Sequence, residues 1–181
     1  SDTDDVLVSA KGEKASFTLI YGTKGLERHL TVVQQEFRRA GVDIKLRLLE
    51  PGTAFERGLE RKYEMTVTGR TSGFYPGVRQ YLHTEFQQKK NNNNIWGFAS
   101  PEVDALIAVY EEDLDPDKRL KAMKRIDEIV REEAFYLPFW NGPFTRIAYW
   151  DYVRFPDDWL PKRAEQLFDW MVFWIDPQRR A

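Results

Sequence analysis

The first third of the chain switches between two hydrophobic periods, and each period predicts a different element. Residues 16–21 (SFTLIY) read as a β-strand, and residues 43–49 (DIKLRLL) alternate apolar and charged side chains, as a half-exposed strand does. Between them, apolar residues recur at steps of four and three, which is typical of one buried helix stripe. The stripe consists of Leu26, Leu30, Val33, Phe37 and Ala40. This pattern predicts a right-handed strand, helix, strand unit with parallel strands.

The next elements extend this unit. Residues 51–62 predict a short helix that carries Phe55 and Leu59, and residues 65–68 predict a third strand. Together they form a βαβαβ half-sheet whose third strand ends at Gly69. Ligands of open α/β sheets bind beyond the carboxyl ends of the strands. We therefore expect a binding site in the segment that follows.

Two helices are predicted in the middle of the chain. Ser100-Pro101 and Asp115-Pro116 each combine a capping residue with a proline at the first helical position. The apolar positions that follow are Val103, Leu106, Ile107 and Tyr110 in the first helix, then Leu120, Met123, Ile126, Ile129 and Val130 in the second. We expect these helices to pack antiparallel across a short turn.

Less regular segments surround these helices. Residues 89–94 (KKNNNN) read as a solvated polar loop. Residues 135–140 (FYLPFW) predict a strand, and Pro138 favours an edge or crossing position because it cannot donate to a ladder. Four prolines interrupt the remainder, for which we predict irregular structure with a strand near residues 170–174.

The segment after the third predicted strand, residues 69–77 (GRTSGFYPG), contains no acid, histidine or cysteine. Catalysis near neutral pH usually needs a titratable group, a metal or an activated nucleophile. Recognition can instead use backbone amides, hydroxyls, an arginine and ring faces. We therefore predict binding and no catalytic residue. The candidate substrate-binding residues are Arg70, Thr71, Ser72, Gly73, Phe74 and Tyr75.

Each candidate also has a structural alternative. The fork of Arg70 suits a carboxylate or phosphate, but it fits a salt bridge within the protein equally well. The hydroxyls of Thr71 and Ser72 could serve only a turn, and the rings of Phe74 and Tyr75 could cover the sheet edge. Two further residues beyond this segment, Arg79 and Gln80, either reach the site or support the following helix.

Composition limits the remaining functions. The 27 basic and 29 acidic residues are mixed along the chain, so no nucleic-acid footprint or polybasic membrane patch is visible. The chain has no cysteine, and its two histidines lack a partner at ligand spacing, so we expect no metal and no cofactor. No signal-peptide pattern or membrane-spanning run is visible, and the opening SDTDDVLV reads as a mid-protein cut or as the start of a mature fragment.

Three strings carry a resemblance that covers most of the chain. They are FTLIYGTKGLERHLTVVQQEFRRAGVDIKLRLLE, YEMTVTGR, and GFASPEVDALIAVYEEDLDPDKRLKAMKRIDEIVREEAFYLPFW. In this order they resemble the C-terminal part of the family 5 extracellular solute-binding proteins of ABC transporters, the oligopeptide- and dipeptide-binding class. Short matches at residues 76–80, 94–97 and 173–177 are similar to the branch that contains the microcin-C and oligopeptide importer's binding protein.

The resemblance implies a periplasmic-binding-protein type II-like α/β lobe. Residues 1–15 would be a leading segment, residues 16–147 the lobe with its crossover strands, and residues 148–181 an aromatic-rich tail that packs on a missing first lobe. It also implies a periplasmic location, or an extracellular and membrane-associated one, with a peptide or small-molecule solute and a membrane permease as partners. A solitary fragment would expose the rings of its tail and self-associate.

One position departs from the family pattern. Peptide-binding relatives carry G-W-x-x-D after the third strand, and the aspartate meets the amino terminus of the peptide. Here Gly69 is followed by Arg70, Thr71, Ser72 and Gly73. Without the acid, a ligand with an anionic or acceptor group is favoured over a free-amine peptide. A hydrolase or nucleotide-using enzyme on a flavodoxin-like sheet, and a protein-interaction or sensor module, remain alternatives.

Overall fold

The computed structural model describes residues 6–69, 76–139, 148–156 and 173–180. The chain divides into two compact units, Ser1–Gly69 with Val78–Ile129, and Arg70–Gly77 with Val130–Ala181. The first unit holds the parallel sheet and most of the helices, and the second holds a small antiparallel sheet. The division predicted from the sequence, after residues 15 and 147, stays a prediction.

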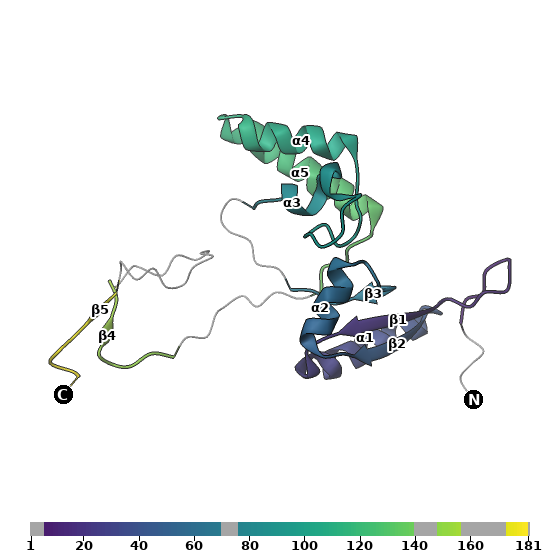
Figure 1. The fold of residues 1–181 in the computed structure, drawn as a ribbon, viewed down its shortest axis with the longest axis horizontal. Coiled ribbons are helices and arrows are strands. Elements are labelled where there is room, and N and C mark those ends of the chain that lie inside the picture. The colour runs from purple at the N-terminus through teal and green to yellow at the C-terminus, as the bar shows by residue number, and fades with distance from the viewer. Residues whose placement is uncertain (1–5, 70–75, 140–147, 157–172, 181) are drawn as a thin grey trace. The chain divides into compact units, whose positions relative to one another are not determined.

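The first unit contains a parallel three-stranded sheet in the order β2-β1-β3. Its strands are β1 (Ser16–Tyr21), β2 (Asp43–Leu48) and β3 (Met65–Thr66), connected by α1 (Glu27–Arg39) and α2 (Pro51–Leu59). The chain moves from β1 outward to β2 and then returns across β1 to β3. Right-handed crossovers in these two directions place α1 and α2 on opposite faces of the sheet (Figure 1). The predicted βαβαβ fold class is confirmed.

The predicted hydrophobic stripe of α1 builds the core on one face of this sheet. Leu30 packs with Leu19, Tyr21 and Ile44, and Phe37 lies partly buried against them. Fully burying an aliphatic or aromatic side chain contributes roughly 1.5–3 kcal/mol. The stripe ends one turn early, because Ala40 is the C-cap of α1 and is exposed.

The apolar side of α2 differs from the prediction. Phe55 is 66% exposed and Leu59 is half-buried. Small residues face the sheet instead, since a Cβ at Gly22 would lie 3.0 Å from the Pro51 Cα and 3.3 Å from the Ala54 Cβ. This close approach leaves no room for a large ring between the helix and the end of β1.

The third strand is shorter than residues 65–68, and a side chain completes its pairing with β1. The Glu64 carboxylate accepts a hydrogen bond from the Thr18 backbone N–H at 2.7 Å. Beyond the strand, the Val67 N–H donates to the Ile20 carbonyl at 3.3 Å. The pKa of Glu64 is lowered, chiefly by the Thr18 N–H.

The remaining helices of the first unit are α3 (Arg79–Leu82), the 3-10 turns η1 (Lys24–Leu26) and η2 (Thr84–Phe86), α4 (Pro101–Glu112) and α5 (Pro116–Glu133). The Ser100 hydroxyl caps α4 by accepting from the Val103 N–H at 3.3 Å. Arg125 pairs with Glu102 at 2.9 Å. The middle of α5 therefore lies beside the start of α4, as expected for an antiparallel pair. Leu120 is the exception among the predicted apolar positions, at 53% exposed.

Residues 86–98, from the last residue of η2 toward α4, are named here the asparagine loop. Residues 89–94 were expected to be solvated; residues 89–91 and 93 are exposed, Asn92 is half-buried, and Asn94 alone contradicts the expectation. Asn94 is 0% exposed, and its side chain bonds both the N–H (3.0 Å) and the carbonyl (2.8 Å) of Phe98. Asn92 bonds the carbonyls of Phe86 and Lys89 and the N–H of Asn94. The amides replace missing secondary structure as backbone partners.

The second unit has an antiparallel pair of two-residue strands, β4 (Val153–Arg154) and β5 (Trp174–Ile175). Residues 135–139, predicted as a strand, form none. A strand needs a hydrogen-bonded neighbour, and no described strand pairs with this exposed segment. Large side chains of the second unit are exposed: Tyr136, Leu137, Phe139, Tyr149, Trp150, Trp174 and Ile175.

Candidate functional site

The carboxyl edge of the parallel sheet is the candidate site, and one of its strand ends is covered. β1 ends at Tyr21, and the first turn of α2 lies against the following Gly22. Glu50 caps that turn through the Thr53 N–H at 2.9 Å, and the backbone N–H of Gly52 and then that of Thr53 lower its pKa. Gly22 precedes η1 and Gly25 lies within it, so the two glycines belong to a helix entry.

The end of β3 is open. Thr68 and Gly69 are exposed, and no described atom lies within 4 Å of a Cβ built at Gly69. In the order β2-β1-β3, the two crossovers run in opposite directions, so the strand order reverses between β1 and β3. Flavodoxin-like sheets bind ligands at this switch point. Thr68 and Gly69, the last described residues after β3, therefore lie at the edge where a sheet of this type binds its ligand.

The predicted binding residues follow Gly69 directly. Arg70, Thr71, Ser72, Gly73, Phe74 and Tyr75 lie outside the described residues. Their assignment stays a prediction. The chain is described again at Pro76, shortly before α3 begins at Arg79.

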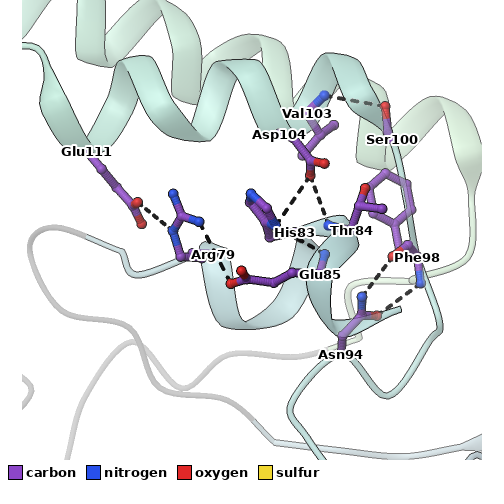
Figure 2. Close-up of polar contacts among 10 residues, drawn as sticks. All are labelled: Arg79, His83, Thr84, Glu85, Asn94, Phe98, Ser100, Val103, Asp104 and Glu111. Carbon is purple, nitrogen blue, oxygen red and sulfur yellow. Dashed lines mark hydrogen bonds and ion pairs between the residues drawn. The ribbon is translucent and has the colours of Figure 1, made fainter. Parts of the chain in front are cut away.

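Arg79 and Gln80, which the sequence left open between the site and the helix, contact other protein groups. The Arg79 guanidinium lies 2.7 Å from the Glu111 carboxylate of α4 and 3.8 Å from that of Glu85 (Figure 2). The Gln80 side-chain oxygen accepts from the Asn93 amide at 2.7 Å. Both residues therefore join α3 to its neighbours.

His83 and Asp104 form the only histidine–acid pair given by the described residues, and their partners indicate a structural role. Asp104 Oδ1 accepts from the Thr84 N–H at 2.9 Å and lies 3.9 Å from His83 Nδ1 (Figure 2). His83 Nδ1 itself accepts from the Glu85 N–H at 3.2 Å. No hydrogen bond joins His83 to the Thr84 hydroxyl, so this group lacks the nucleophile–base contact of a hydrolase.

The described part of the chain contains no group of three or more His, Asp or Glu side chains placed to hold a metal ion. It also contains no helix with the length and apolar character needed to cross a bilayer.

Two residues important for the edge were missed by sequence reasoning. Arg61 and Tyr63, between α2 and β3, reach the asparagine loop: Arg61 bonds the Asn94 carbonyl, and the Tyr63 hydroxyl donates to the Ile95 carbonyl at 2.8 Å. Neither follows a helix or strand period. One of the strings that carry the family resemblance starts at Tyr63, but it gave no indication that the Tyr63 hydroxyl contacts Ile95.

Similar proteins agree with this geometry. No protein-family model matches the chain. The chain is 26% identical over 153 residues to the protein y4wM of Sinorhizobium fredii, covering 83% of this chain and 23% of that protein. It is 22% identical over 170 residues to YejA of Agrobacterium fabrum, named a probable peptide-binding protein, covering 86% of this chain and 28% of that protein.

A solved structure shows the fold. The oligopeptide-binding protein AppA of Bacillus subtilis, in complex with a nonapeptide, superposes with a TM-score of 0.64 and 21% identity, covering 75% of this chain and 27% of that protein. This chain has the fold of a lobe of the ABC-transporter peptide-binding proteins. The resemblance drawn from the sequence is confirmed. The chain spans about a quarter of the length of the relatives it matches.

Proposed function

We propose that this chain is the C-terminal lobe of the substrate-binding component of an ABC importer, which captures oligopeptides or related peptide-like solutes and delivers them to a membrane permease. The observation that carries the proposal is the open end of β3 at the switch point of a β2-β1-β3 sheet. Similarity to proteins named as peptide-binding supports the solute class. The periplasmic location follows from the same proposal.

The proposed solute contacts are Arg70, Thr71, Ser72, Gly73, Phe74 and Tyr75. The chain between Gly69 and Pro76 has a cation and no acid. A peptide with a free, cationic amino terminus therefore lacks a charge-assisted partner there, whereas a carboxylate or phosphate gains the Arg70 fork. The function is binding, with no covalent step.

Isothermal titration calorimetry on the natural protein that contains this chain tests the proposal. We expect an amino-terminally acetylated peptide to bind at least about tenfold more tightly than the same peptide with a free amino terminus. The reason is a charge-assisted hydrogen bond from Arg70 to the acetyl oxygen, which contributes about 1.5–3 kcal/mol. Arg70→Gln removes this preference. Lys45→Gln, on an exposed position of β2, is the matched control and leaves it unchanged.

Two results contradict the proposal. Equal affinity for both forms of the peptide contradicts the assigned ligand chemistry. Mass spectrometry that finds a cleaved or modified peptide after incubation contradicts a binding function and supports the enzyme alternative.

The exposed rings of the second unit are proposed to pack on the part of the protein that precedes this lobe. Trp150 is 72% exposed, Tyr149 58% and Trp174 51%, and the relatives are about four times as long as this chain. Exposed apolar surface of this kind favours association. Sedimentation velocity should show self-association of the 181-residue chain and none of the longer natural protein; the reverse result contradicts this partner.

A further inference from the structure

Arg61 occupies a backbone position that is usually given to glycine. It follows the end of α2 with φ +56, in the left-handed region. The Arg61 N–H donates to the Gly58 carbonyl at 3.1 Å and the Lys62 N–H to the Arg57 carbonyl at 2.9 Å. These two bonds define a Schellman motif, in which the left-handed residue is most often glycine because other residues carry a steric cost. A large side chain retained here indicates a separate purpose.

The side chain of Arg61 is held by the asparagine loop. Its guanidinium makes five hydrogen-bond contacts, all to backbone carbonyl oxygens, with the two N–H groups of Nη2 shared among three of them, and it reaches across 25 to 33 positions of sequence. The four carbonyls belong to Phe86, Gln87, Lys89 and Asn94. We name this group the Arg61 clamp.

The clamp requires a planar, multidentate donor. Nε and Nη2 both bond the Asn94 carbonyl, at 3.0 and 2.8 Å, while Nη2 also meets Phe86 and Lys89, each at 3.0 Å. Only a guanidinium supplies five donors in one fixed plane. A lysine ammonium has three donors on one atom and cannot reach carbonyls spread around that plane.

Neighbouring contacts strengthen the same junction. The Tyr63 hydroxyl donates to the Ile95 carbonyl, and the Asn91 N–H donates to the Leu59 carbonyl at 3.1 Å. Gly97, with φ +70, lies beside the guanidinium: a Cβ there would be 3.5 Å from Arg61 Nη1. The turn between α2 and β3 is thereby fastened to the chain that follows η2.

The geometry points to Arg61 as a positioning residue that fixes α3 relative to β3. In the sequence, the proposed solute-binding residues lie between these two elements. Arg61, the donor of the clamp, lies four residues before β3. Among the acceptors, Phe86 is the last residue of η2, and η2 is separated from α3 by one residue. Gln80 of α3 is also bonded to the loop through Asn93. This inference rests on the proposed function for its effect on solute affinity.

The test compares Arg61→Lys and Arg61→Gly in the natural protein that contains this chain. Arg61→Lys keeps the charge and loses most of the bonds. Arg61→Gly loses all of them but relieves the left-handed backbone. We expect both variants to bind an acetylated peptide at least tenfold more weakly than the unmodified protein. Ile126→Val, at a buried position of α5, is the control: we expect it to lower the melting temperature and to leave the affinity unchanged.

A merely stabilising role predicts another result. If affinity follows melting temperature in the same way for Arg61→Lys, Arg61→Gly and Ile126→Val, the positioning role is wrong. Restoration of full affinity by Arg61→Lys likewise overturns it, because one ammonium cannot rebuild the clamp.

Amide hydrogen exchange gives a readout that needs no solute. We expect faster exchange in both Arg61 variants within residues 86–97 and also in α3 and the end of β3, with α5 unchanged. Acceleration confined to residues 86–97 overturns the inference. If the unmodified protein binds no peptide, the proposed function fails, and this exchange pattern alone still decides whether Arg61 positions α3 against β3.

Discussion

The sheet core and the asparagine loop hold their backbones with different chemistry. The core of β1, β2 and α1 is apolar, with Leu30 and Ile44 at 2% and 1% exposed. The asparagine loop has a polar centre, where Asn94 is 0% exposed and Arg61 meets four carbonyls. Both regions belong to the first unit.

The difference shows two ways to satisfy a backbone. In the sheet, strands bond to one another and the side chains only need to exclude water, so any close-packed apolar set suffices. In the loop, the carbonyls have no ladder, so each needs a particular donor at a particular distance. The substitution of a buried apolar side chain and the substitution of a hydrogen-bonding side chain should therefore lower the unfolding free energy for different reasons.

The largest effect is expected from Ile44→Ala. This residue lies at the centre of the apolar core, and its truncation leaves a cavity, which costs about 3 kcal/mol of unfolding free energy. Urea denaturation followed by circular dichroism measures it. Val32→Ala on the exposed side of α1 is the control, at 56% exposed, and should stay close to the unmodified chain. Similar losses from both substitutions would mean that burial does not decide stability here.

Asn94→Ala comes next, at about 2 kcal/mol. It leaves the Phe98 N–H and carbonyl without partners, and an unsatisfied buried polar group costs more than a bond contributes. The same denaturation experiment applies. Asn93→Ala removes an exposed side chain whose partner is Gln80, so its loss should be clearly smaller. Equal losses would contradict the distinct role of the buried amide.

A smaller effect is expected for the Arg79–Glu111 pair. Both side chains are about one third exposed, at 36% and 35%, so water and salt screen the pair. A double-mutant cycle with Arg79→Gln and Glu111→Gln should give a coupling of about 0.5 kcal/mol. The coupling should vanish in concentrated sodium chloride; a coupling that persists there would place the pair in a drier environment.

The smallest effect concerns pH. The pKa of Glu64 lies below its ordinary value of 4.5 because the Thr18 N–H bonds its carboxylate. The folded pKa is the lower one, so this stabilisation is complete above pH 4.5 and is lost as the pH falls through the folded value. Glu64→Gln should therefore show a shallower loss of unfolding free energy in that window. The slopes of the two proteins should agree above pH 6, and parallel curves at acid pH would contradict the assignment.

The sheet was accessible to sequence reasoning because each of its elements repeats a local period. The alternation in residues 43–49 and the stripe from Leu26 to Phe37 predicted β2 and α1 closely. Glu64 could not be found in this way. Its carboxylate takes the place of a backbone partner for the Thr18 N–H, and that need depends on where β3 separates from β1. Residues 135–139 were mispredicted for the opposite reason: they have strand composition, but no described strand pairs with them.

The amino-acid order alone settled which residues repeat with a helix or strand period, and therefore the parallel βαβαβ unit and the location of its open edge. Folding in three dimensions decided which polar groups meet, because a carbonyl becomes a partner only after distant segments approach. Arg61 and the asparagine run look like ordinary surface residues when read along the chain. Once α2 and the asparagine loop are in contact, the guanidinium is the donor group that the unpaired carbonyls require.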